Sequence, residues 1–234
     1  MWLVHMVAWH ATCGLFALCD ARGWFLRYKL IRRDRVSYAS VMPLVLFNQC
    51  VILLPCILAV AHLGLGLRGV AQYAWWCVAL HIWLFGYAHD ALFYAGHAIM
   101  HTRLGYKLFS HRVHHLSNGA TAAASMYMAP QDFVFEIVVP TLVFFMFYDT
   151  SWHFDMCIAI VGSAAPSFEH SGYYVPLPWN SFDTRPHISH HQKRPHGSFS
   201  EGIFSSSMCD WLFGTAISEK ERKDLTAHGR TASQ

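Results

Sequence analysis

The sequence predicts an all-α integral membrane protein, with about three long transmembrane helices, a short helical hairpin and a cytosolic helical cap. The first reason is composition, because 54% of the 234 residues are hydrophobic and 13% are charged, about half the charged fraction of an ordinary soluble domain. The second reason is that the apolar residues gather in runs of membrane length instead of amphipathic stripes. The third is a set of histidine clusters at helical spacing.

Three apolar runs approach the roughly 20 residues that cross the hydrocarbon of a bilayer. They cover residues 2–19, 41–67 and 71–88, and we expect a long helix from each. The first run could instead be a signal peptide, but no basic residues precede its apolar part and no small-x-small pattern stands before Asp20. We therefore expect this run to remain as a membrane anchor.

Two shorter apolar runs, residues 133–148 and 152–165, are separated by a polar tripeptide. A helical hairpin that dips into the bilayer or barely crosses it fits both runs; the alternative is a pair of buried helices in a soluble cap. Pro140 predicts a kink or a break in the first arm. The chain then divides into N-terminal spans, residues 1–95, and a histidine-rich region, residues 96–234, that includes the hairpin.

Charge gives the expected orientation. The loop between the first two runs, residues 22–35, carries six Arg or Lys side chains against the single acid Asp34, and such loops stay cytoplasmic. The N-terminus would then lie across the membrane, with every histidine cluster on the cytosolic side. The net charge of +3 suits an anionic membrane surface and does not indicate nucleic acid binding. The seven cysteines lie mostly in apolar runs and are expected to be buried hydrophobes, not a disulfide framework.

Nine histidines form three clusters and one outlier. The first cluster has H-x3-H spacing and the other two have H-x2-H-H spacing, so their side chains share one face of a helix. Neutral imidazoles are ligands for first-row transition metals, and nine exceed what one ion can hold. We therefore expect a di-metal site in the cap. The candidate ligands are His97, His101, His111, His114, His115, His170, His187, His190 and His191.

The ligands alone do not select among iron, copper, zinc and nickel. A zinc finger is a poor interpretation, because no C-x2-C pair stands beside the clusters. A di-iron pair with neutral ligands could activate dioxygen against an unactivated C–H bond, whereas a di-zinc pair would hydrolyse through a bound water. An embedded enzyme has reason to act on a lipid, which favours oxygen chemistry and leaves hydrolysis open. The remaining histidines are expected to be structural or exposed: His5, His10, His62, His81, His89, His153, His196 and His228.

Several ordered motifs resemble the fatty acid hydroxylase and sterol desaturase superfamily of membrane-bound non-haem di-iron enzymes, most closely its C-4 methylsterol oxidase branch. The resemblance covers about residues 30–215 as one domain. The motifs are Asp90-Ala91-Leu92-Phe93-Tyr94 before His97 and His101, His111-Arg112-Val113-His114-His115, Phe168-Glu169-His170-Ser171-Gly172-Tyr173, His187-Ile188-Ser189-His190-His191, and Asp210-Trp211-Leu212-Phe213-Gly214-Thr215.

The resemblance implies a role for each clustered histidine. It assigns one ion to His97, His111, His114, His187 and His190, and the other ion to His101, His115, His170 and His191. Asp90, Glu169 and Asp183 are candidates to fix the imidazole tautomers, with a surface or capping role as the alternative for each. The chain departs from the pattern at Ala129 and Asp132, where the branch shows H-P-x-E, and at Pro166, where other branches place a fourth-upstream histidine.

The resemblance also implies an activity: oxygen-dependent hydroxylation or stepwise oxidation of a C–H bond on a sterol, terpenoid or fatty acyl lipid. Two iron ions would be the cofactor, and zinc could replace them in a purified form. Electrons would come from cytochrome b5 or an NAD(P)H-dependent reductase docking at the cytosolic face of the endoplasmic reticulum. Three alternatives stay open, namely a lipid desaturase of the same superfamily, a di-zinc lipid hydrolase and a non-catalytic metal-binding membrane protein.

Overall fold

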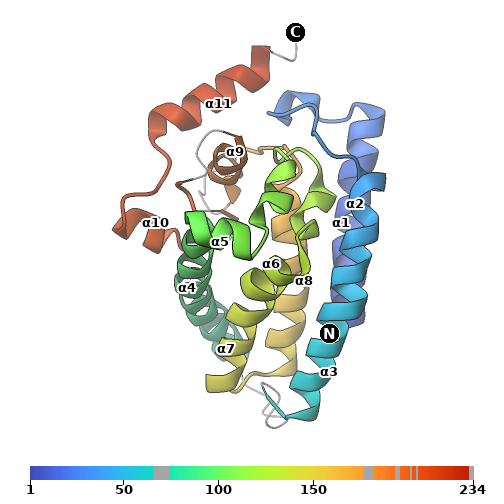
Figure 1. The fold of residues 1–234 in the computed structure, drawn as a ribbon, viewed down its shortest axis with the longest axis vertical. Coiled ribbons are helices and arrows are strands. Elements are labelled where there is room, and N and C mark those ends of the chain that lie inside the picture. Colours follow the sequence, from blue (N-terminus) through green and yellow to red (C-terminus); the bar gives the residue numbers. More distant parts are fainter. Residues whose placement is uncertain (66–73, 177–181, 193–195, 201, 204, 232–234) are drawn as a thin grey trace.

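The computed structural model describes residues 1–65, 74–176, 182–192, 196–200, 202–203 and 205–231. Within these residues the structure is helical and contains no β-strand beyond an isolated antiparallel bridge between Lys29 and Tyr173. The predicted all-α class is confirmed. The long helices lie side by side in one bundle, and a cap of shorter helices covers one end of it (Figure 1).

The bundle has five arms. They are α1 (Trp2–Arg22), the arm formed by α2 (Tyr38–Phe47), a π-helical turn and α3 (Leu54–His62), α4 (Trp75–Met100), the arm that ends in α7 (Val139–Phe147), and α8 (Trp152–Glu169). The helix α1 packs on α8, and α4 packs on both α7 and α8. Because consecutive arms alternate in direction, the C-terminal ends of α1, α4 and α8 meet at the capped end (Figure 1).

Three helices are long and apolar enough to cross a membrane: Trp2–Arg22, Tyr38–His62 and Pro130–Phe147. The first two confirm the predicted spans. The span expected at 71–88 is not among these three: residues 71–73 lie outside the described residues, and α4, which covers the rest of that run from Trp75, carries His81, His89 and Asp90, which lower its hydropathy. The third such helix is instead the first arm of the hairpin, which is longer than the sequence suggested because its capped end continues to Pro130.

Prolines explain why two arms change their helical form. A π-helical turn over Asn48–Leu53 precedes α3, and another over Val134–Val138 separates the short helix α6 (Pro130–Phe133) from α7. Pro55 and Pro140 each occupy one of the first two positions of the α-helix that follows the turn. A proline has no N–H to donate to the preceding turn, and the wider turn accommodates that loss. Where the sequence predicts a kink or a break at Pro140, the structure shows a π-helical turn just before it and an arm that continues.

The cap consists of short helices at the ends of the bundle arms. They are α5 (Arg103–Leu108), two 3₁₀ helices over His111–Leu116 and Ala122–Met126, α9 (Arg185–Gln192), α10 (Met208–Leu212) and α11 (Glu219–Thr231). A small apolar cluster of Leu30, Ile188, Ile217 and Leu225 joins the basic loop, α9 and α11. The basic loop therefore lies at the same end as the histidines, as the charge argument requires; the cytosolic identity of that end stays a prediction.

Candidate metal centre

All nine clustered histidines converge at the capped end of the bundle. His97 lies in the last turn of α4, and His101 caps that helix. His170 caps α8 in the same way, and the third cluster lies on α9. The second cluster differs from the expected α-helical face, because residues His111–Leu116 form a 3₁₀ helix. The tighter turn of that helix still brings the cluster to the centre, with His111 and His114 fully buried.

The nine side chains form two groups whose ligand nitrogens lie within 4.8 Å of one another in each group. The expected sizes of five and four agree with the structure, but the expected membership does not. His101 and His115 join the larger group, and His114 and His187 join the smaller one. The five-histidine group is His97, His101, His111, His115 and His190; the four-histidine group is His114, His170, His187 and His191.

The membership follows a pattern of spacing along the chain. Each pair four positions apart, His97 with His101, His111 with His115 and His187 with His191, stays within one group. Helical geometry explains the pairs on α4 and α9, because residues four positions apart on an α-helix face the same way; it does not explain His111 and His115, which belong to a 3₁₀ helix. The intervening histidine of each H-x2-H-H element, His114 or His190, points to the opposite group. The two elements thus contribute ligands to both groups and connect them.

The distances between imidazoles match the edges of a metal coordination shell. Nε2 of His101 lies 3.3 Å from that of His97 and 3.2 Å from that of His115. In the other group, Nε2 of His170 lies 3.2 Å from that of His114 and 3.0 Å from that of His187. Two nitrogens bound at about 2.0–2.1 Å to one ion, at ordinary coordination angles, lie about 2.9–3.4 Å apart. Both groups therefore have the spacing that one ion each would require.

Hydrogen bonds on the outer side of the rings fix which nitrogen faces inward. Nδ1 of His97 lies 2.6 Å from the Phe199 carbonyl, and Nδ1 of His170 lies 2.8 Å from the Pro166 carbonyl. His190 and His191 make the same contact with the carbonyls of Gly197 and Ser117, at 2.7 Å and 3.1 Å. A carbonyl only accepts, so each Nδ1 carries the proton and each Nε2 presents a lone pair to the interior. This is the tautomer that binds a metal.

Burial keeps these imidazoles neutral. Loss of solvation, followed by the proximity of other histidines, holds the pKa of His114, His115 and His191 well below 6.5. The same causes lower the pKa of His101 to about 2. Nε2 of His191 is buried and has no hydrogen-bond partner among the described residues, although an unpaired buried polar atom is costly. A cation in each group would satisfy these lone pairs, so the residues present fit two metal ions.

A buried carboxylate pair supports the five-histidine group, and the sequence analysis missed it. Both oxygens of Asp132 accept from Nδ1 of His111, at 3.1 Å and 3.0 Å, and Oε2 of Glu136 lies 3.7 Å from the same nitrogen. Asp132 is fully buried and Glu136 nearly so. The available signal was two acids four residues apart in an otherwise apolar helix, where an acid needs a partner. Asp132 was noted only as a departure from the H-P-x-E pattern.

The three acids that the sequence proposed for this role have other contacts. Asp90 accepts from the hydroxyls of Ser205 and Ser206 and so holds the segment before α10. Glu169 accepts from the backbone N–H of Ile203. Asp183 pairs with Arg185 and Arg222, which ties the start of α9 to α11.

Two further aspartates hold the loops that supply the carbonyl acceptors. Asp210 accepts from the backbone N–H groups of Phe199 and Ser200, at 2.9 Å and 2.7 Å, which positions the Phe199 carbonyl over His97. Asp34 accepts from the Ser117 hydroxyl at 2.7 Å and from the Ala120 N–H at 2.9 Å, beside the carbonyl that receives His191. Asp210 opens the last motif of the sequence, which gives that motif a structural purpose.

A cavity of about 260 Å³ opens directly onto the four-histidine group. Its wall includes His114, His170 and His187 at one end, and apolar side chains such as Phe85 and Phe93 of α4 along its length. Asp90, Glu136 and Glu169 also line it. An apolar ligand in this cavity would lie against the candidate metal centre, with a few acids beside it.

Comparison with known proteins supports the same interpretation. A family model described as fatty acid hydroxylase matches residues 82–215, which contain all nine histidines. The chain is 32% identical to a protein of Oryza sativa subsp. indica named very-long-chain aldehyde decarbonylase GL1-11, over 91% of this chain and 86% of that protein. It is 30% identical to one named very-long-chain aldehyde decarbonylase GL1-8 from the same subspecies, over 92% of this chain and 82% of the relative. No solved structure matches the chain.

Proposed function

Because the chain belongs to the fatty acid hydroxylase family, whose members are oxidoreductase-type enzymes acting on lipids, we propose that it is a membrane-bound di-iron oxygenase of a long-chain lipid. It would hydroxylate or stepwise oxidise a C–H bond, using dioxygen and electrons from a separate donor. The observation that carries the proposal is the pair of adjoining imidazole groups, of which the four-histidine group lies at the end of a largely apolar cavity.

The five-histidine group would hold one iron ion and the four-histidine group the other. When bound, the two ions supply the activation of dioxygen that no side chain can provide. The protein's own contribution is positioning: the carbonyls of Phe199 and Pro166 and the carboxylate of Asp132 hold the rings in their binding tautomer. Glu136, whose Oε2 has no hydrogen-bond partner among the described residues, stands at the cavity wall where a proton can be held.

Among the lipid classes that the sequence leaves open, a fatty acyl chain is favoured over a sterol or a terpenoid. The cavity is lined mainly by side chains of three neighbouring helices and follows their length, and the names of the rice relatives refer to very-long-chain aldehydes. Those names also favour a second candidate, loss of the carbonyl carbon of a long-chain aldehyde at the same centre. A C-4 methylsterol oxidase activity stays a prediction of the sequence.

Cytochrome b5 or an NAD(P)H-dependent reductase would supply electrons at the capped end, which we place on the cytosolic face of the endoplasmic reticulum. The basic loop supports this placement, since it lies at the same end as the histidines.

The test is dioxygen consumption by the purified, iron-loaded protein with a reductant, with and without long-chain acids, alcohols or aldehydes, followed by mass spectrometry of the lipids. Lipid-dependent uptake with a product that gains one oxygen atom is the expected result. A product lacking two hydrogens would make the protein a desaturase, and a chain shortened by one carbon would select the decarbonylase. Retention of zinc, rejection of iron and no uptake with any lipid would refute the proposal in favour of a di-zinc hydrolase or a non-catalytic metal-binding protein.

A further inference from the structure

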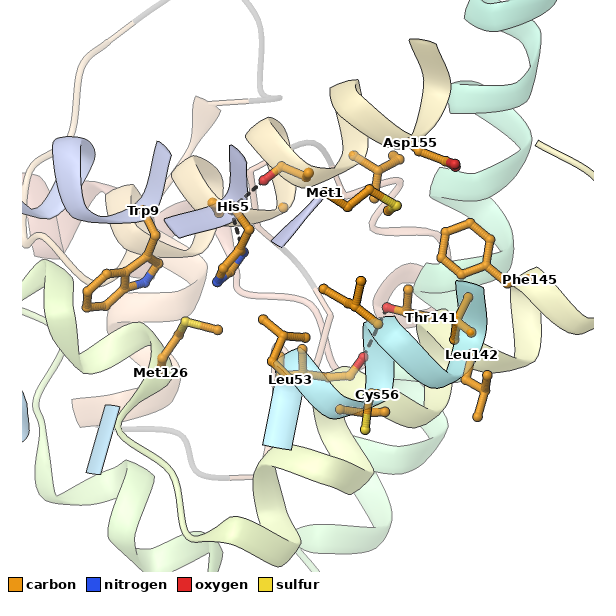
Figure 2. A pocket seen from close by; sticks show the side chains of 18 of the residues that line it. Met1, His5, Trp9, Leu53, Cys56, Met126, Thr141, Leu142, Phe145 and Asp155 are labelled. Carbon is orange, nitrogen blue, oxygen red and sulfur yellow. Dashed lines mark hydrogen bonds between the residues drawn. The ribbon is translucent and has the colours of Figure 1, made fainter. Parts of the chain in front are cut away.

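A second cavity, of about 340 Å³, lies deeper in the bundle and away from the clustered histidines. Figure 2 shows it between α1, α3, α7 and α8, with Leu53, Leu142 and Phe145 along its wall. Most of the lining is apolar, and the polar exceptions include His5, which hydrogen-bonds to Ser163 at 2.7 Å. None of the nine clustered histidines lines this cavity, so it is a feature distinct from the candidate metal centre.

The two cavities adjoin each other. Six residues line both, and three of them lie on α8: Ser125, Ile137, Thr141, Ile158, Gly162 and Pro166. On α8, Ile158, Gly162 and Pro166 recur every four residues and so form one face of the helix. The same face continues to Glu169 and His170 at the metal centre. One face of α8 therefore lines the wall from the histidines to the deeper cavity.

Gly162 is the residue at which the space along this face is most easily closed. A Cβ atom built on Gly162 meets no atom within 4 Å, so the glycine is not needed for close packing of helices or for an unusual backbone angle. A long side chain at this position would project into the shared space without a clash at its base. Gly162 lines both cavities, so a side chain added there would change the wall that they share.

We propose that Gly162 determines substrate chain length: the alkyl chain of the lipid passes from the metal centre over Gly162 and places its far end in the cavity between α1, α3, α7 and α8. This inference rests on the proposed function insofar as the substrate is a long-chain lipid. The deeper cavity would hold the part of the lipid's alkyl chain beyond the reacting carbon. A flexible alkyl chain is therefore the class of ligand that fits both cavities.

The test uses photo-crosslinking and does not depend on turnover or on bound metal. The full-length protein in detergent is incubated with lauryl or stearyl alcohol that carries a diazirine at the chain end, irradiated, and digested for mapping of the labelled peptides. In the wild-type protein the stearyl probe should label the segments around Leu53 and Leu142. In Gly162→Leu this labelling should fall by about tenfold or more, because several methylene groups lose their apolar site, while the shorter probe should still label the segment around Phe93.

Gly14→Leu is the matched control. Gly14 is also a glycine within a bundle helix, and a Cβ built on it likewise meets no atom within 4 Å. It lines neither cavity, so the labelling of this variant should equal that of the wild type. Metal content measured in parallel shows whether each variant is folded at the centre.

Two results would overturn the inference directly: no stearyl labelling of the deep segments in the wild type, or labelling that is unchanged in Gly162→Leu. Loss of labelling by both probes would also overturn it, since Gly162 would then control entry instead of length. The expected labelling without dioxygen uptake would leave the chain-length role intact and refute only the oxygenase.

Discussion

Substitution of Asp132 by asparagine should weaken metal binding at the five-histidine group without unfolding the protein. Both carboxylate oxygens lie 3.0–3.1 Å from Nδ1 of His111, so the variant loses the negative charge that stabilises the bound imidazole and keeps one accepting oxygen at most. Loss of such a partner typically weakens metal affinity about 10- to 100-fold, or about 1.4–2.8 kcal/mol. Oε2 of Glu136 lies 3.7 Å from the same nitrogen and can replace part of the contact. The loss of affinity in Asp132→Asn should therefore lie near the lower end of that range. In the double variant Asp132→Asn/Glu136→Gln it should lie near the upper end.

The assay is a competition for cobalt between the purified protein and a chelator of known affinity. The absorbance of the bound cobalt measures how much of it the protein holds. Asp183→Asn is the control, since Asp183 is also a buried acid of the cap but pairs with Arg185 and Arg222 instead of a histidine. It should lower the thermal stability of the cap and leave cobalt affinity unchanged. The reasoning is refuted if Asp132→Asn binds cobalt as the wild type does, or if Asp183→Asn loses as much affinity.

Three other outcomes follow from the geometry. His190→Ala should lose metal and abolish turnover while the protein still inserts into membranes; retained activity would remove His190 from the ligand set. Asp210→Ala should lower the metal content strongly and the thermal stability only slightly, because it releases the loop whose Phe199 carbonyl accepts from His97. Metal analysis and thermal unfolding of the same samples measure the two effects. The metal-free protein should lose stability as the pH falls below 6.5. Histidines such as His101, whose pKa is lowered to about 2 in the folded protein, bind protons in the unfolded state and not in the folded one. Each such histidine lowers the free energy of unfolding by up to about 1.4 kcal/mol per pH unit. Thermal unfolding in chelator measures this, and a stability independent of pH between 6.5 and mildly acidic values would contradict it.

The sequence predicted the nine histidines and their meeting at one end because both follow from local rules. Helical spacing places side chains on one face, and the alternating direction of the arms brings the clusters to one end of the bundle. The division of the histidines between two ions came from the resemblance, and the grouping of the side chains in the structure differs from it at His101, His114, His115 and His187. The α-helical spacing of His97 with His101 and of His187 with His191 favours the grouping that the structure shows.

The supporting contacts could not be predicted, since they depend on where loops place backbone carbonyls. Nothing in the sequence around Ser117 or Phe199 indicates that its carbonyl would receive a histidine from another element. Asp132 was obscured for a different reason: the segment was interpreted by its apolar character, in which an acid counts only as an interruption. The span expected at 71–88 overlaps α4, whose polar residues near the histidines leave it outside the set of helices apolar enough to cross a membrane.

The division of the histidines has a consequence for the order in which the members of each group are synthesised. Four members of the five-histidine group, His97, His101, His111 and His115, lie within 19 consecutive residues. The four-histidine group takes His170, His187 and His191 from a later part of the chain. When the helical hairpin emerges from the ribosome, the five-histidine group therefore already has four of its members and the four-histidine group only His114. The two groups nevertheless become complete together, because their last members, His190 and His191, are consecutive residues of α9.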